Sequence, residues 1–194
     1  MSHSLAVSLK KNMTILLVLA LLLATATLGG STATAISQPA NFQVYLKLDS
    51  IPGESTARGY EQWIPVSDVQ FGVENTPLSP TAPGRPSLNG VRFAKVFDAA
   101  SMPIFLASLQ GKHIKSATFV FVKQLAAPVK FLTLNLNDVL VTSYSFDDTV
   151  ESVSLDYKVI SVGYSSQKPD GSMSAMIKSA WDVAKGTVTT PVIP

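Results

Sequence analysis

The sequence contains no cysteine, only two histidines and few charged residues. Without cysteine no disulfide can form, so the fold must be held together by burial of apolar side chains or by association with copies of itself. A zinc site would have to be built mainly from carboxylates, which is not how zinc is usually bound. Charged residues make up 14% of the chain, against about 25% in average soluble domains. These shortages argue against a disulfide scaffold and against a zinc protein.

The N-terminal segment explains part of the low charge. A pair of lysines, Lys10-Lys11, precedes the uncharged apolar run Thr14–Ala24, and small residues follow. A basic region, a short apolar core and an A-x-A site are the layout of a secretory signal peptide. The apolar run is shorter than the roughly 20 residues of a membrane span. We therefore predict a signal peptide with Ala33 and Ala35 at its cleavage site.

Removal of residues 1–35 would leave a mature domain without net charge. The two lysines leave with this segment, so 13 basic and 13 acidic residues remain. Because nucleic-acid binding needs a basic surface, we expect no nucleic-acid partner, and we expect no stable membrane association after cleavage. The predicted location is the periplasm or the medium. Since no charge lies between Lys11 and Lys47, an uncleaved membrane anchor is the alternative.

Alternation of apolar and polar residues predicts β-strands across most of the mature chain. Every second residue of Phe42–Leu48 is apolar, and Lys130–Val141 shows the same pattern. The run Gln62–Val73 contains a proline and a glycine, which predicts a broken or bulged strand. In Ser152–Tyr164 the apolar face changes sides, so we expect a bulge or a strand that passes between sheets. This density of strands predicts a sandwich or barrel.

One segment predicts a helix. Ser101 is placed to cap its N-terminus, Pro103 lies in its first turn, and Gly111 suits the left-handed position that ends it. A single helix among many strands is expected to plug one end of a barrel. Its predicted buried face consists of Ile104, Phe105, Leu106 and Leu109.

The residues needed for catalysis are nearly absent. His113 is the only histidine after the signal segment and is interpreted as a helix cap. Asp147-Asp148 could ligate a cation, but it lacks the spacing of a calcium loop and is interpreted as a solvated turn. Trp63 and Trp181 are interpreted as core or interface aromatics, with a ligand platform as the alternative. No phosphate loop or activated nucleophile is found. We predict no enzyme, no cofactor and no metal.

Five segments of the mature chain are informative as an ordered set: Tyr45–Ser55, Trp63–Val73, Phe93–Ala117, Phe131–Ser145 and Glu151–Val183. Taken together, they resemble the Hcp family, the haemolysin-coregulated tube proteins of bacterial type VI secretion. They cover nearly all of residues 42–184 in the family's order. The resemblance implies a mainly β fold, a compact barrel of two antiparallel sheets with one short helix. It also implies a six-membered ring with an open pore, rings that stack, small effector proteins in the pore, and spike or sheath proteins as partners.

The resemblance assigns roles to two regions. Alignment of the VQFG run places Gln70 at the family's pore-lining position, where an uncharged polar side chain would suit a wet channel. An ordinary solvent-facing strand residue is the alternative. The connection Glu74–Gly90 takes the place of the family's extended loop, which contacts neighbouring subunits and rings. It is rich in proline here, and its marked residues are Glu74, Pro77, Pro80, Pro83, Gly84, Pro86 and Gly90.

The signal peptide departs from the family pattern, because tube proteins of this family ordinarily carry none. Two hypotheses follow. The chain is a ring- and tube-forming structural protein that is exported or secreted, or it is a stand-alone secreted or periplasmic binding module on the same barrel. The predicted organisation is a signal peptide over 1–35, a barrel domain over 36–186 and a C-terminal tail over 187–194.

Overall fold

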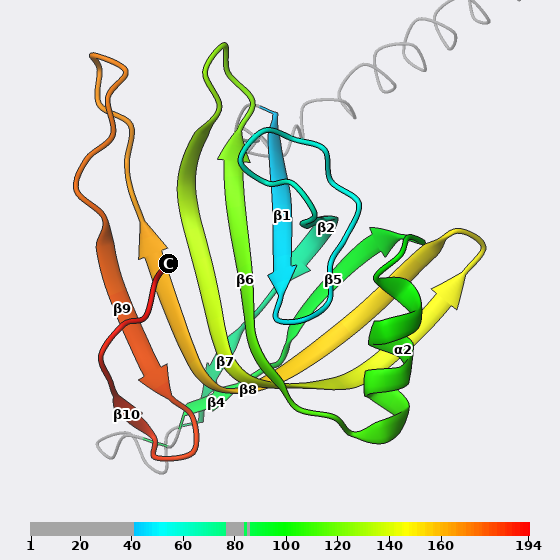
Figure 1. Cartoon of the computed structure of the whole chain (residues 1–194). Coiled ribbons are helices and arrows are strands. Elements are labelled where there is room, and N and C mark those ends of the chain that lie inside the picture. The colour runs from blue at the N-terminus through cyan, green and yellow to red at the C-terminus, as the bar shows by residue number, and fades with distance from the viewer. Residues whose placement is uncertain (1–40, 77–83, 85) are drawn as a thin grey trace, which may run out of the picture. The chain divides into compact units, whose positions relative to one another are not determined.

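The computed structural model describes residues 41–76, 84 and 86–194, and the predicted signal peptide lies outside them. All paired strands are antiparallel. Six strands close into a barrel in the order β8-β5-β2-β1-β6-β7, because β7 also pairs with β8 (Figure 1). These strands are β1 (Phe42–Leu48), β2 (Ile64–Gln70), β5 (Val91–Val96), β6 (Ile114–Lys123), β7 (Val129–Asp147) and β8 (Val150–Tyr164).

Four short strands of the described residues lie outside the barrel. β9 (Ile177–Asp182) pairs with the second half of β8, and β10 (Thr187–Val188) pairs with the end of β9. β3 (Val73–Asn75) and β4 (Pro86–Leu88) form a separate two-stranded ladder. The predicted mainly β barrel with one short helix is therefore confirmed, and its strands form one continuous sheet that closes on itself.

The change of apolar face predicted in Ser152–Tyr164 is confirmed by the pairing of β8. Its residues 150–155 pair with β5, and its residues 159–164 pair with β9. In the first half the odd-numbered Val153 and Leu155 are fully buried, whereas in the second half the even-numbered Ile160 belongs to the core and Val162 packs against it. The strand therefore runs from one wall of the barrel into another, and the inward side of the chain changes between them.

The break predicted in Gln62–Val73 is also confirmed. β2 ends at Gln70, its register against β5 shifts between Ser67 and Gln70, and the chain resumes as β3. Within the shift, Asp68 has a φ of 49°. This bulge lets β2 pair with β1 through its first half and with β5 through its second, as barrel closure requires.

The helix α2 (Ser101–Gln110) ends as predicted, with Gly111 left-handed at a φ of 57°. Its start differs from the prediction. The N-cap is Ala100, and Ser101 is the first helical residue, because the Ser101 hydroxyl turns inward to bond Lys95 and Glu151. No helix among the residues described has the length and apolar character needed to cross a membrane.

The predicted buried face of α2 is wrong for three of its four residues. Phe105, Leu106 and Leu109 are 37%, 50% and 68% exposed, while Ile104 and Ala107 enter the barrel core. α2 packs on β7 through a narrow stripe of Ser101, Ile104 and Ala107, where small side chains allow close approach. The helix covers this part of the barrel core with its narrow face and turns its larger apolar face outward.

Candidate functional site

The residues that were candidates for chemistry do not form a reactive site. Among the residues described, no three acidic or histidine side chains gather to hold a metal. His113 Nδ1 lies 2.6 Å from a carboxylate oxygen of Asp138, and both side chains are exposed. Asp148 adopts a φ of 58° in the tight turn between β7 and β8. The interpretation of Asp147-Asp148 as a solvated turn is confirmed.

A row of polar side chains runs across the outer face of β2, β5, β8 and β7. Gln70 is paired with Arg92, Arg92 with Ser154, and Ser154 with Ser143. A second row follows the same strands with Ser67, Ala94, Ser152 and Ser145. We call the eight residues of these two rows the polar wall.

The polar wall faces outward because of the strand alternation. In β5 the residues on either side of Arg92, Val91 and Phe93, are 0% and 1% exposed, while Arg92 itself is exposed. A hollow of about 410 Å³ lies over the wall and is lined by Gln70, Arg92, Ser154 and Asp156, among others. The wall carries small hydroxyl side chains and no large apolar one. Gln70 thus lies on an exposed polar surface, and its assignment to a pore stays a prediction.

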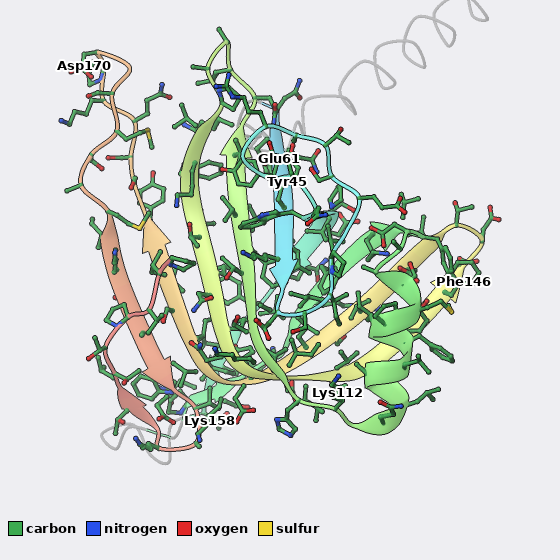
Figure 2. All side chains as sticks on the ribbon, viewed as in Figure 1. Tyr45, Glu61, Lys112, Phe146, Lys158 and Asp170 are labelled. Atoms are coloured by element: carbon green, nitrogen blue, oxygen red, sulfur yellow. The ribbon has the colours of Figure 1, made fainter. Side chains whose placement is uncertain are left out.

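At one end of β5 lies an exposed apolar surface that we call the α2 patch. Phe97 and Phe146 meet edge to face at 5.6 Å, and Phe105 rests against Tyr144 at 5.4 Å. Figure 2 shows Phe146 on the β7–β8 hairpin beside α2. Isolated exposed apolar residues are normal, but a contiguous group marks an interaction site. The patch consists of Phe97, Met102, Phe105, Leu106, Leu109 and Phe146, each 37% to 68% exposed.

At the other end of β5 lies an apolar hollow of about 390 Å³, which we call the β3–β9 groove. Phe71, Val73 and Val188 on its rim are 44%, 57% and 76% exposed. Trp181 lines the groove and also packs against the core, so its interpretation as a core or interface aromatic is confirmed. The groove is lined by Phe71, Val73, Pro86, Leu88, Ile160, Val162, Ser179, Ala180, Trp181 and Val188.

The groove includes the base of the predicted extended loop. Val73 pairs with Leu88, and Glu74 pairs with Ser87, so the loop begins as a two-stranded stem. Gly84, Pro86 and Gly90 are also described, and Pro86 faces the groove. Pro77, Pro80 and Pro83 lie outside the described residues. The contact role predicted for this loop stays a prediction.

The α2 patch and the β3–β9 groove lie at opposite ends of β5. β4 ends at Leu88, three residues before β5 starts at Val91, and β5 ends at Val96, one residue before Phe97 of the patch. Figure 1 shows β9 and β10 on one side of the barrel and α2 on the other. The polar wall occupies the strands between them.

A buried polar network joins α2 to the barrel. Lys95 Nζ lies 2.5 Å from a carboxylate oxygen of Glu151 and 2.8 Å from Asp98, and the Lys95 and Glu151 side chains are 0% exposed. The Ser101 hydroxyl accepts a hydrogen bond from Lys95 Nζ and donates one to Glu151. The Tyr144 hydroxyl donates to the other Glu151 oxygen. The network connects β5, α2, β7 and β8.

Ser101 and Lys95 are nevertheless no catalytic pair. A neighbouring base can activate a serine as a nucleophile, but Ser101 is 0% exposed and two carboxylates engage Lys95. Burial, followed by the hydrogen bond to Glu151 and its charge, raises the pKa of Tyr144 to about 12. The phenol therefore keeps its proton at neutral pH and remains a donor. The network is structural.

A third hollow, of about 520 Å³, lies between the C-terminal segment and the 57–63 loop. Tyr60 stacks on Tyr45 with ring centres 4.6 Å apart, and Trp63 meets Tyr60 edge to face. Trp63 packs in this aromatic cluster, which confirms it as a packing aromatic. The C-terminal segment crosses β8, where the Val192 amide donates to the Ser161 hydroxyl.

The comparisons with known proteins agree on one family. The model of a family described as "Type VI secretion system effector, Hcp" matches residues 45–164. A solved type six secretion system protein has 25% identity and a TM-score of 0.71, covering 77% of this chain and 100% of its own. Hcp1 from Salmonella typhimurium has 22% identity and a TM-score of 0.62, covering 76% and 99%. A type VI secretion system effector from Yersinia pestis has 26% identity and a TM-score of 0.60, covering 72% and 99%. Among curated proteins no match was found.

Proposed function

Because the chain belongs to the Hcp family of type VI secretion proteins, we propose that it is a structural protein that closes into a six-membered ring. The observation that carries the proposal is the order of surfaces along β5, where an apolar surface lies at each end of a polar wall. A closed head-to-tail ring covers both apolar surfaces on every subunit and leaves the wall in water. The function is assembly, and no enzymatic step is part of it.

The polar wall is proposed to line the lumen of the ring. Gln70 and Arg92 are exposed, and the serines around them offer hydroxyl groups that exchange hydrogen bonds with water. Such a surface offers no large apolar side chain that would trap an apolar chain. It would let small effector proteins occupy the pore, and rings would stack through the extended loop. Spike and sheath proteins are the further proposed partners.

The solution mass of residues 36–194 tests the ring. Light scattering on a sizing column is expected to give six times the subunit mass, and negative-stain images of the peak are expected to show rings. A subunit mass at every concentration tested would overturn the ring. It would favour a stand-alone exported binding module on the same barrel.

The position of Gln70 is tested separately, and the absence of cysteine makes this simple. In rings labelled with a nitroxide at Q70C, distances between neighbouring copies are expected to be shorter than in rings labelled at K130C. Gln70 lies on the polar wall, whereas Lys130 is on the part of β7 that pairs with β6. Equal or longer distances at Q70C would remove Gln70 from the lumen.

Export is proposed from the signal-like segment, and the N-terminus of the mature protein tests it. When the full chain is expressed in a Gram-negative host, the exported protein is expected to begin at Ile36 by mass spectrometry. Recovery of the intact chain in the membrane fraction would instead support the uncleaved anchor. Recovery of the intact chain in the cytoplasm would remove export altogether.

A further inference from the structure

We propose that the α2 patch of one subunit docks into the β3–β9 groove of the next, and that this contact repeats around the ring. The inference rests on the proposed ring and specifies the surfaces that form it. Among the described residues, no other part of the subunit covers either surface, and together the two surfaces include many of the large exposed apolar side chains of this part of the chain.

The α2 patch has the apolar character of a surface that docks into a groove. Met102, Leu106 and Leu109 are spaced along one outward face of the helix and are 50%, 50% and 68% exposed. On the same helix Phe105 rests against Tyr144, and two residues further along β7 Phe146 meets Phe97 edge to face. All six members are apolar. Burial of large apolar side chains of this kind supplies most of the energy of a protein interface.

The β3–β9 groove has the matching chemistry of a receptor. Ser179 is the one residue of its lining with a polar side chain, and the other nine are apolar. The groove is formed by the β3–β4 stem on one side and by β8, β9 and β10 on the other. Because its lining contains no charged residue, a charged or nucleic-acid ligand would find no partner there. An apolar side chain would displace its water favourably.

A second copy of this chain is the occupant that the arrangement favours. If two patches met around a two-fold axis, both grooves would stay exposed, and two facing grooves would leave both patches exposed. A patch in a groove uses both surfaces of every subunit, and the two surfaces lie at opposite ends of β5. Such a contact is head to tail. It forms a closed ring when the rotation from one subunit to the next, repeated, returns to the first subunit. Since neither surface carries charge, the ring is expected to keep its mass when the salt concentration is raised.

Two single variants separate the two surfaces. L109D places a charge in the patch and V188D places one in the groove, and the two replaced side chains are 68% and 76% exposed. Both variants are expected to keep the circular dichroism of the parent and to fall from ring mass to subunit mass. L125D is the matched control, because Leu125 is 41% exposed in the β6–β7 turn and belongs to neither surface. It is expected to keep the ring.

A mixture of the two variants gives the decisive measurement. L109D retains an intact groove and V188D retains an intact patch, so an equimolar mixture is expected to form a two-subunit complex containing one of each. If the parent forms rings and both variants also do, the surfaces are wrong while the ring stands. If V188D remains a dimer, or the mixture stays monomeric, the patch does not pair with the groove. If the parent itself is monomeric, the proposed ring fails first, and this contact fails with it.

Discussion

Loss of the charge on Glu151 is expected to be among the most destabilising conservative changes in this protein. Glu151→Gln keeps the size of the side chain, but its single amide oxygen can accept only one of the hydrogen bonds that the two carboxylate oxygens receive from Ser101 and Tyr144. It removes the carboxylate that lies 2.5 Å from the Lys95 ammonium, where both side chains are 0% exposed. The lysine is then left buried with only Asp98, 2.8 Å away, as a charged partner.

The expected size follows from this remaining pair. Removing one partner of a buried ion pair costs about 3–5 kcal/mol, because the other charge loses its compensation in a poorly solvated place. Asp98 still provides part of the compensation, so E151Q is expected near the lower value, about 3 kcal/mol. Lys95→Met leaves Glu151 with two hydroxyl donors and no cation, and is expected to cost about 4 kcal/mol.

The double variant K95M/E151Q tests the cause of these costs. With both charges gone, neither is left uncompensated, so its cost should lie at least about 2 kcal/mol below the sum of the single costs. Urea unfolding measures the free energies of unfolding of E151Q, K95M and K95M/E151Q. All are compared at one protein concentration, because assembly adds stability that depends on concentration. K168M, on an exposed turn, is the control and should change stability by less than about 0.5 kcal/mol. Additive costs, or an E151Q cost below about 1 kcal/mol, would refute a role for the buried charges.

Two further predictions concern the tyrosines and the glycines. Burial is the main cause that raises the pKa of both Tyr144 and Tyr157 to about 12. The folded protein therefore favours the protonated phenol. Its contribution to the free energy of unfolding is complete below pH 10 and is lost as the pH rises from 10 to 12. An absorbance titration should show two tyrosines that ionise near pH 12, and Y144F and Y157F should each remove one of these ionisations. Ionisation of both tyrosines near pH 10 would contradict the prediction. Gly111→Ala should cost about 1 kcal/mol for its φ of 57°. Gly53→Ala should cost more in urea unfolding, because its Cβ would lie 2.5 Å from the Trp63 carbonyl oxygen.

The strands could be predicted where each has one buried face. Phe42–Leu48 was predicted with the bounds that β1 has, since its alternation continues to both ends. The strand predicted over Lys130–Val141 was too short, because β7 continues to Asp147. The added residues belong to the hairpin that extends past β6, which pairs with β7 only up to Val139. Where the barrel no longer covers a strand, its alternation no longer separates core from solvent.

The functional surfaces depend on register, which no local pattern specifies. Gln70, Arg92 and Ser154 are far apart in the chain and become neighbours only through the pairing of β2, β5 and β8. The helix face was mispredicted for the same reason, because apolar residues encircle much of α2 and only the packing on β7 decides which are buried. A signal for Lys95 and Glu151 does exist. Lys95 lies two residues after the buried Phe93, and Glu151 lies two residues before the buried Val153. Residues two apart in a strand face the same side, so both charges are placed inside the core.

The position of the buried network connects the stability of the barrel with the geometry of the proposed ring. An ion pair inside a core is often less stabilising than apolar side chains of the same size. Here it lies where β5, β7 and β8 meet α2, directly beneath the patch that we assign to the contact. Ionic and hydroxyl partners fix direction as well as distance, whereas the apolar stripe of Ile104 and Ala107 alone would let the helix slide or rotate. A ring closes only if each contact repeats the same rotation, so an error in the helix position would be repeated at every subunit. We infer that the network sets the angle of the α2 patch. If it does, K95M/E151Q should retain much of its stability and still form incomplete or heterogeneous rings.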